Sequence, residues 1–260
     1  MERTSSRPTI PRRRLLAAGA AGLGLATVGA LPHATRAAAP RAACAEGVQE
    51  IIDTALVAEQ LATTFYYTGL TTHAVMADPR TAGAGGDPNA VGPDGNRVNV
   101  AYLQAALDQE QKHARILAGA GAASPYTHFY FPATTFESLG FTNRTGTYLW
   151  VLDHLETAFI GAYLTAAQRF GALERVDLAV VALRILAVEC QHRALYRVIS
   201  EDDPADNVTV EVADFSCVAD AAGVLKPFLT GQGFPGRAGP AVPLPTAAQT
   251  ARAIGLNTSS

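Results

Sequence analysis

The sequence has no basic cluster beyond its N-terminal segment. Residues 1–37 contain six arginines and one glutamate, and without them the formal net charge changes from −3 to about −8. Proteins that bind nucleic acids need Lys and Arg side chains in contact with phosphate. We therefore expect no nucleic-acid partner.

A phosphate-binding loop is also missing. Gly83–Gly86 lies in a segment rich in Gly, Asp, Asn and Pro, but no Gly-x-x-x-x-Gly-Lys pattern is present. We interpret residues 78–97 as a surface loop.

Cysteine is scarce, with three residues in the chain. Cys44 lies before the first expected helix of the fold and Cys217 after the last. A disulfide could tie these flanks together, or both could remain thiols. Cys190 is interpreted as a small buried hydrophobe rather than a metal ligand, because it points about 100° away from the adjacent Glu189 on a helix.

No run in the N-terminal region is long and apolar enough to identify a membrane span. Leu15 to Leu31 has 17 residues, many of them Ala and Gly, whereas a spanning helix needs about 20 apolar residues. Arg12-Arg13-Arg14 precedes this run, and adjacent arginines before an apolar stretch indicate a twin-arginine export signal. We expect a signal peptide over 1–37, a linker over 38–46, the export machinery as a partner, and a periplasmic or secreted protein.

What the chain does contain is one pattern repeated twice. A lone Glu in an apolar segment is followed, in the next such segment, by Glu-x-x-His. Residues three apart on a helix differ by about 60° and rise about 4.5 Å, so both side chains reach the same point. Four such helices can form the ligand set of a carboxylate-bridged dinuclear metal site. The predicted metal ligands are Glu59, Glu110, His113, Glu156, Glu189 and His192.

The helical phase of these residues places them on apolar faces. Glu156, for example, interrupts the stripe that contains Leu152, Phe159 and Ile160. Charged groups are almost never fully buried unless they are paired or bind a metal. The alternatives to a metal site are a set of solvated surface residues and a buried Glu–His network without metal.

The periodicity predicts an all-α, antiparallel four-helix bundle over residues 47–200. A long crossover joins the second helix to the third, so these two helices run parallel. We expect the tail, 201–260, to be irregular and to wrap the bundle, with a short helix near 219–228 and a strand or extended segment over 208–215. The four bundle helices are expected at 47–74, 98–120, 146–170 and 173–200.

The two halves of the pattern mirror each other. Tyr66 and Tyr163 each lie seven residues after a lone Glu, which suggests a duplicated helix pair with a pseudo-twofold axis. Packing in the core explains these tyrosines better than a redox role. His128 and His154 are interpreted as surface or hydrogen-bonded residues.

The ligand pattern resembles that of the ferritin-like superfamily of di-iron and di-manganese carboxylate proteins. The segments 58–66, 129–132, 155–158 and 186–189, with the leader, resemble its exported branch, whose plant relatives include desiccation-related proteins. The likeness covers roughly residues 47–200.

This resemblance implies two metal ions, iron or manganese, and redox chemistry on iron, dioxygen or peroxide. The alternatives are peroxide disproportionation, as in manganese catalases, and a non-catalytic metal-binding or stress-protective protein. The expected partners are metal ions and small oxidants. Nothing in the sequence argues for a closed many-subunit shell, and a smaller homo-oligomer stays open.

Overall fold

The computed structural model describes residues 44–140, 145–201, 204–213 and 215–255. The predicted signal peptide and most of the linker lie outside these residues. Within the described part of the chain, no helix has the length and apolar character needed to cross a membrane.

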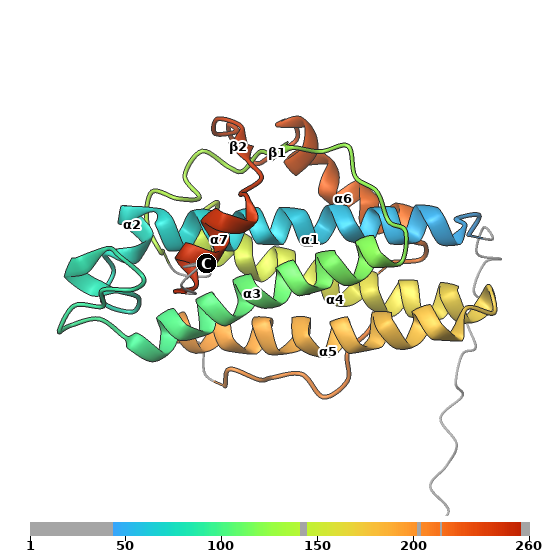
Figure 1. The fold of residues 1–260 in the computed structure, drawn as a ribbon, viewed down its shortest axis with the longest axis horizontal. Coiled ribbons are helices and arrows are strands. Elements are labelled where there is room, and N and C mark those ends of the chain that lie inside the picture. Colours follow the sequence, from blue (N-terminus) through green and yellow to red (C-terminus); the bar gives the residue numbers. More distant parts are fainter. Residues whose placement is uncertain (1–43, 141–144, 202–203, 214, 256–260) are drawn as a thin grey trace, which may run out of the picture. The chain divides into compact units, whose positions relative to one another are not determined.

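Four long helices form the bundle, which confirms the predicted fold class (Figure 1). Neighbouring helices run antiparallel, and the second and third long helices run parallel, as the crossover requires. Each helix begins and ends within three residues of its predicted range. The long helices are α1 (Val48–Thr71), α3 (Arg97–Gly119), α4 (Tyr148–Ala172) and α5 (Val176–Ile199).

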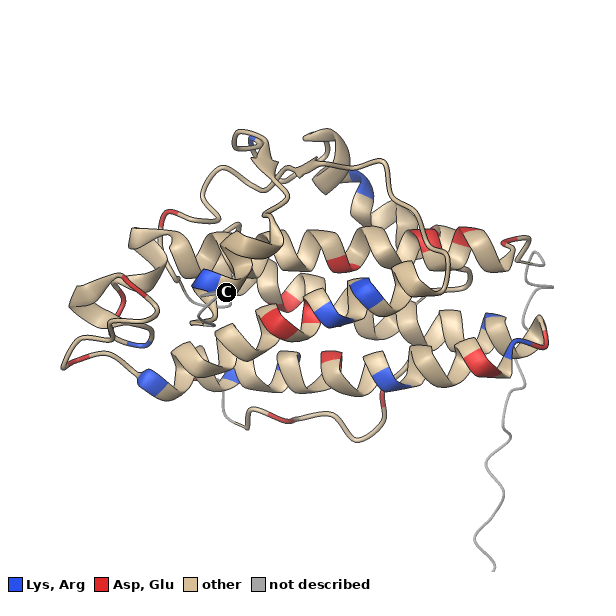
Figure 2. Cartoon of the chain, in the orientation of Figure 1, with Lys and Arg blue, Asp and Glu red and all other residues tan. Residues whose placement is uncertain are grey.

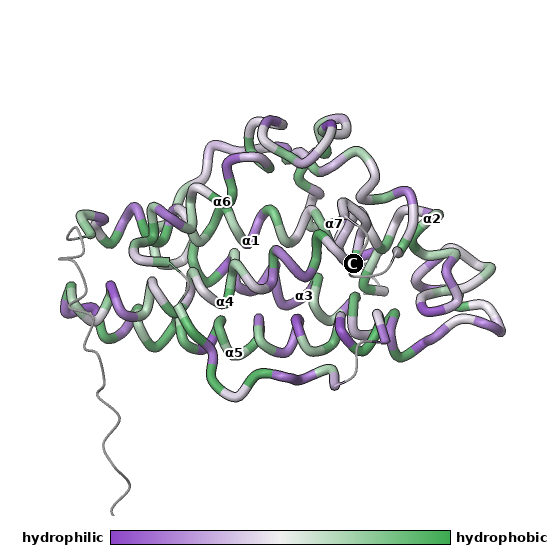
Figure 3. The backbone as a smooth tube through the Cα atoms, turned by 180° about the vertical axis from the view of Figure 1, so that it is seen from behind, coloured by the Kyte–Doolittle hydropathy of each residue, from purple (hydrophilic) through white to green (hydrophobic). Residues whose placement is uncertain are grey.

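Burial of apolar side chains holds the four helices together. Figure 2 shows that charged residues occupy few positions along them, and Figure 3 shows hydrophobic and hydrophilic positions alternating along each helix. Such alternation gives each helix an apolar face toward its neighbours. Any carboxylate on that inner face is consequently surrounded by hydrocarbon.

The core differs between the two ends of the bundle. Where α1 ends and α4 begins, Phe65 stacks on Tyr148 with ring centroids 4.5 Å apart, and Phe131 and Phe136 pack against Phe65. Gly69 permits this close approach, because a Cβ there would lie 2.3 Å from the Tyr148 ring. The opposite end is lined mainly by Ile, Leu and Ala side chains.

Shorter elements cover the bundle. The α1–α3 connection contains α2 (His73–Met76) and the 3-10 helix η2 (Gly83–Gly85), and the crossover contains β1 (His128–Phe129). The tail contains α6 (Val218–Thr230), β2 (Val242–Pro243) and α7 (Ala247–Ala253).

The tail is more regular than predicted. The expected short helix is present as α6, but α7 was not predicted, and the described part of 208–215 forms no strand. β2 pairs with β1 in antiparallel register, and Tyr130 N–H donates to the Phe228 carbonyl. Crossover and tail therefore lie against each other over α1.

A disulfide joins Cys44 to Cys217, across 173 positions of sequence. Cys217 is the N-cap residue of α6, so the bond ties the start of α6 to the segment before α1. Cys190 is the free cysteine among the described residues, and it is half-buried. The pairing that the sequence left open is thus present.

Replacing both Cys44 and Cys217 by serine should lower the free energy of unfolding by about 2–4 kcal/mol, because the bond restricts a long loop in the unfolded chain. Urea denaturation followed by circular dichroism would measure the change. The Cys190→Ser variant is the control and should be much less affected. Equal stability of the double variant and the wild type would contradict this account.

Candidate metal centre

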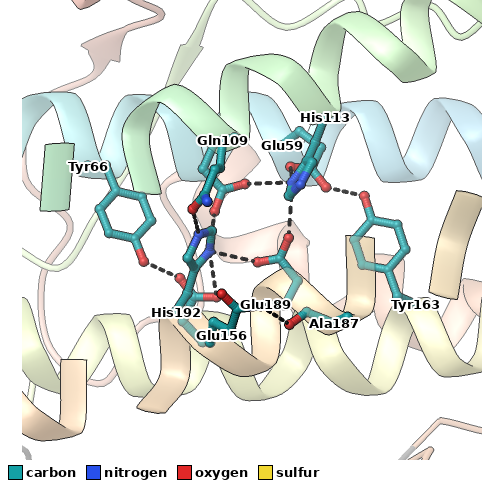
Figure 4. A network of polar contacts seen from close by, with 11 residues as sticks. Glu59, Tyr66, Gln109, His113, Glu156, Tyr163, Ala187, Glu189 and His192 are labelled. Atoms are coloured by element: carbon teal, nitrogen blue, oxygen red, sulfur yellow. Dashed lines mark hydrogen bonds and ion pairs between the residues drawn. The ribbon is translucent and has the colours of Figure 1, made fainter. Parts of the chain in front are cut away.

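The structure brings all six predicted ligand residues together in the middle of the bundle (Figure 4). One comes from α1, two from α3, one from α4 and two from α5. The four glutamates are at most 2% exposed and the two histidines at most 6%. Helical phase explains why all six point inward, since each residue continues the buried stripe of its helix.

The residues form two overlapping groups, each centred on one histidine. His113 Nδ1 lies 3.2 Å from Glu59 Oε2, 3.6 Å from Glu110 Oε2 and 3.2 Å from Glu189 Oε1. Ligand atoms of these four residues all lie within 4.8 Å of one another. A single cation between them could contact an imidazole nitrogen and three carboxylates.

The second group repeats the first. His192 Nδ1 lies 3.0 Å from Glu110 Oε1, 3.2 Å from Glu189 Oε2 and 3.9 Å from Glu156 Oε2. Glu110 and Glu189 belong to both groups and turn one oxygen toward each histidine. They are thus in the position of bridging carboxylates, while the lone glutamates lie at the two outer ends.

Two tyrosines link the halves. Tyr66 of α1 donates a hydrogen bond to Glu156 of α4, and Tyr163 of α4 donates one to Glu59 of α1. Both rings are buried, as predicted, but they are more than core filling because each hydroxyl holds a lone glutamate of the opposite half. In the sequence, the signal for this reciprocal contact was that each tyrosine follows the lone glutamate of its own half by seven residues.

The donor set fits a pair of divalent cations. Among the described residues, both oxygens of Glu110 and one each of Glu156 and Glu189 are buried without a hydrogen-bond donor in suitable geometry. Leaving such oxygens unsatisfied is costly. Two divalent ions would satisfy them and carry four positive charges, equal to the charge of the four carboxylates. Mixed oxygen and nitrogen ligands suit iron, manganese or zinc.

A family model described as the ferritin-like domain matches residues 47–201, more than half of the chain. The chain belongs to the ferritin-like family. The matched range contains the four bundle helices and the crossover, and it ends before α6 and α7. No curated protein and no solved structure matched the chain.

Gln109 is a residue of this ferritin-like site that the sequence did not reveal. Its Oε1 lies 2.8 Å from His192 Nε2, so Nε2 donates the proton and Nδ1 faces the carboxylates. The corresponding position before Glu189 is Val188, which has no acceptor in its side chain. The pseudo-twofold pair is therefore unequal, because Gln109 orients only one of the two histidines.

Burial makes the carboxyl groups compete for protons. It raises the pKa of Glu59 well above the ordinary value, and the negative charge of Glu110 adds to this effect. Burial likewise raises the pKa of Glu156. Burial acts in the same direction on Glu110, but attraction to the charge of His192 outweighs it, and the pKa of Glu110 is held below its usual range.

The histidines shift in the same direction as the lone glutamates. Burial alone would lower the pKa of His113 and His192, but the surrounding carboxylates outweigh it and raise the pKa of each well above its ordinary value. Without metal, both histidines, Glu59 and Glu156 therefore hold their protons more tightly than the free side chains do. A metal ion must displace these protons to bind.

The other histidines and the cysteine considered from the sequence, His128, His154 and Cys190, lie outside the cluster. His128 is exposed on β1, next to Tyr130, and exposed His154 lies against Trp150, as predicted. Cys190 has its pKa raised to about 11, chiefly by burial and then by Glu211, which makes it a poor thiolate ligand at neutral pH.

Metal-free protein should lose stability as pH rises from about 4.5 to 8. Glu and His titrate near 4.5 and 6.5 when unperturbed, and their raised native pKa values mean that the folded state binds more protons than the unfolded one in this range. Urea denaturation of chelator-treated protein would measure this.

With metal bound the slope should reverse below about pH 6.5, because protons then compete with the metal for the same atoms. A metal-free protein whose unfolding free energy rises steadily from pH 4.5 to 8 would contradict the raised pKa values of the cluster.

Changing Gln109 to Val, the residue found in the other half, should weaken one of two metal-binding steps by about 10–100-fold, because His192 would lose its orienting acceptor. Anaerobic calorimetric titration with Mn²⁺ would resolve the two steps. Gln191→Val, at an exposed position of α5, is the matched control and should bind like the wild type. Equal weakening of both steps in Gln109→Val would contradict a role confined to His192.

Proposed function

We propose that this chain is an exported ferritin-like protein whose dinuclear metal–carboxylate site carries out redox chemistry on iron, dioxygen or peroxide. The proposed ligands are Glu59, Glu110, His113, Glu156, Glu189 and His192. One observation carries the proposal: each histidine faces three carboxylates, and Glu110 and Glu189 face both histidines.

The protein's own groups would hold the metals and control their surroundings. Two iron or manganese ions would supply one-electron redox steps at adjacent centres. Tyr66 and Tyr163 hold Glu156 and Glu59 in place by hydrogen bonds, and Gln109 keeps Nδ1 of His192 directed inward. The buried position of the cluster excludes bulk water, which strengthens its electrostatic interactions.

Two observations support export. Residues 1–37 have the arginines and apolar run of a twin-arginine leader, and the disulfide Cys44–Cys217 is of the kind that persists in oxidising compartments. Export of the folded protein would allow the metals to be inserted in the cytoplasm. We assign the chain to the exported branch of the family, whose plant relatives include desiccation-related proteins, because segments 58–66, 129–132, 155–158 and 186–189 resemble it.

A second candidate is a metal site that only stabilises the bundle. Its favouring observation is complete burial, since Glu110, Glu156 and Glu189 are 0% exposed. Metal that binds only the folded state raises stability by mass action. This function predicts a higher melting temperature with metal, and neither ferroxidase nor peroxide chemistry.

Elemental analysis of protein exported by its own host tests the proposal first, and two iron or two manganese ions per chain are expected. The double variant Glu110→Ala/His113→Ala should lose two-metal binding, because Glu110 belongs to both groups. Retention of two metals per chain by this variant would rule out the assignment of the site.

A matched control uses a glutamate and a histidine that lie outside the cluster. Glu50→Ala/His154→Ala removes one exposed residue of each type from the bundle helices and should keep both metals. Ferrous oxidation and oxygen release from peroxide, measured on the native metal form, then separate iron chemistry, manganese catalase activity and the purely stabilising role.

A further inference from the structure

Two apolar cavities lie beside the cluster, at the aliphatic end of the bundle. The inner cavity, of about 30 Å³, lies between the four long helices, and its lining includes Ile52, Leu117 and Ile185. The other, also about 30 Å³, lies between α1, α4 and α6, and its lining includes Ala58 and Leu225. Both exceed the roughly 10–15 Å³ that one water molecule requires.

Both cavities end on the same tyrosine. Tyr163, Ala55 and Ala166 line each of them. The Tyr163 hydroxyl donates to Glu59, and the other oxygen of Glu59 lies 3.2 Å from His113 Nδ1. Figure 4 shows Tyr163 on the side of the cluster away from Tyr66. The cavities thus adjoin the Glu59–His113 end.

The walls of these cavities determine what they can hold. Among the residues that line the inner cavity, Tyr163 is the one with a polar side-chain group, and its hydroxyl is already bonded to Glu59. Apolar cavities of this kind stay dry and take up nonpolar molecules such as xenon. A hydrated ferrous ion or hydrogen peroxide would lose hydrogen bonds on entry without replacement. A small nonpolar gas would not.

The opposite side of the cluster is different. The void beside His192 measures about 10 Å³, and its lining includes three tyrosines, Tyr66, Tyr102 and Tyr196. Beyond it, the aromatic stack around Phe65 fills the core. Of the cavities described here along residues 44–255, the two of about 30 Å³ with apolar walls lie on the Tyr163 side.

We propose that the two cavities flanking Tyr163 are a dioxygen site, through which dioxygen reaches the Glu59–His113 end of the cluster. The outer walls are accessible, since Ile116 is 48% exposed at the inner cavity and Val224 of α6 is 39% exposed at the other. Gas binding follows from the cavities alone, and its delivery for reaction rests on the proposed function.

Xenon, a nonpolar probe of similar size, tests the binding step without metal. Crystals of the metal-free protein under xenon pressure should show anomalous density next to Tyr163, in one or both cavities. Ordered water filling both cavities, with no xenon there, would overturn the proposal.

A filling variant tests the passage. Ala166→Leu adds side-chain volume where both cavities meet, and it should abolish the xenon density while two metals still bind. The second-order rate constant for dioxygen consumption by ferrous-loaded protein should fall by about tenfold, which corresponds to about 1.4 kcal/mol of added entry barrier. The rate with hydrogen peroxide as the oxidant should change much less.

Ala106→Leu is the matched control, because Ala106 is as buried as Ala166 but lines the void on the His192 side. It should retain the xenon density and the wild-type rate with dioxygen. An equal fall in the dioxygen rate constant of both variants would overturn the proposal that dioxygen passes through these cavities. So would an equal fall in the rates of Ala166→Leu with dioxygen and with peroxide.

The outcomes separate this proposal from the proposed function. Xenon beside Tyr163 in a protein that binds no metal would refute the metal site and leave the gas site standing. Two bound metals without xenon would refute the gas site and leave the metal site standing. If Ala166→Leu fails to fold, the xenon experiment on the wild-type protein still decides the binding step.

Discussion

The burial of four carboxylates around two imidazoles is the constraint on which the rest of this structure depends. Each glutamate continues the apolar face of its helix and is shielded from water. An unpaired charge in such a buried position is very unfavourable. The cluster meets this cost internally, through the two histidines, the hydroxyls of Tyr66 and Tyr163, and the raised pKa values of the lone glutamates. Two divalent cations would neutralise the carboxylates in place of protons. Metal binding to this cluster would therefore be coupled to the folding of the domain.

The pseudo-twofold symmetry of the ligands does not extend to their surroundings. His192 is oriented by Gln109, whereas the equivalent position in the other half is Val188. Aromatic rings pack the core at one end of the bundle, and cavities with mainly aliphatic walls remain at the other. A duplicated ligand set can thus offer two unequal metal positions, one firmly oriented and one adjacent to nonpolar space.

The covering elements stabilise this arrangement from outside. α6 lies over one of the two cavities and is tied by Cys217 to Cys44, just before α1. β1 and β2 pair the crossover with the tail, and α7 packs against α1 and α3. These contacts join segments far apart in sequence, so they restrict the ends of the helices on which the ligands lie.

The sequence by itself determined the four helices, the parallel second and third helices and the six inward-facing residues, because spacings of three, four and seven positions have a definite meaning on a helix. The tail helix α7 was missed, although Thr246 and Gln249 carry the local signal of a capping box. Only the tertiary structure decided which glutamates face both histidines, which glutamate each tyrosine holds, that Gln109 contacts His192, and where cavities remain. Those features depend on contacts between side chains of different helices, and helical periodicity places a residue on a face without specifying its partner across the bundle.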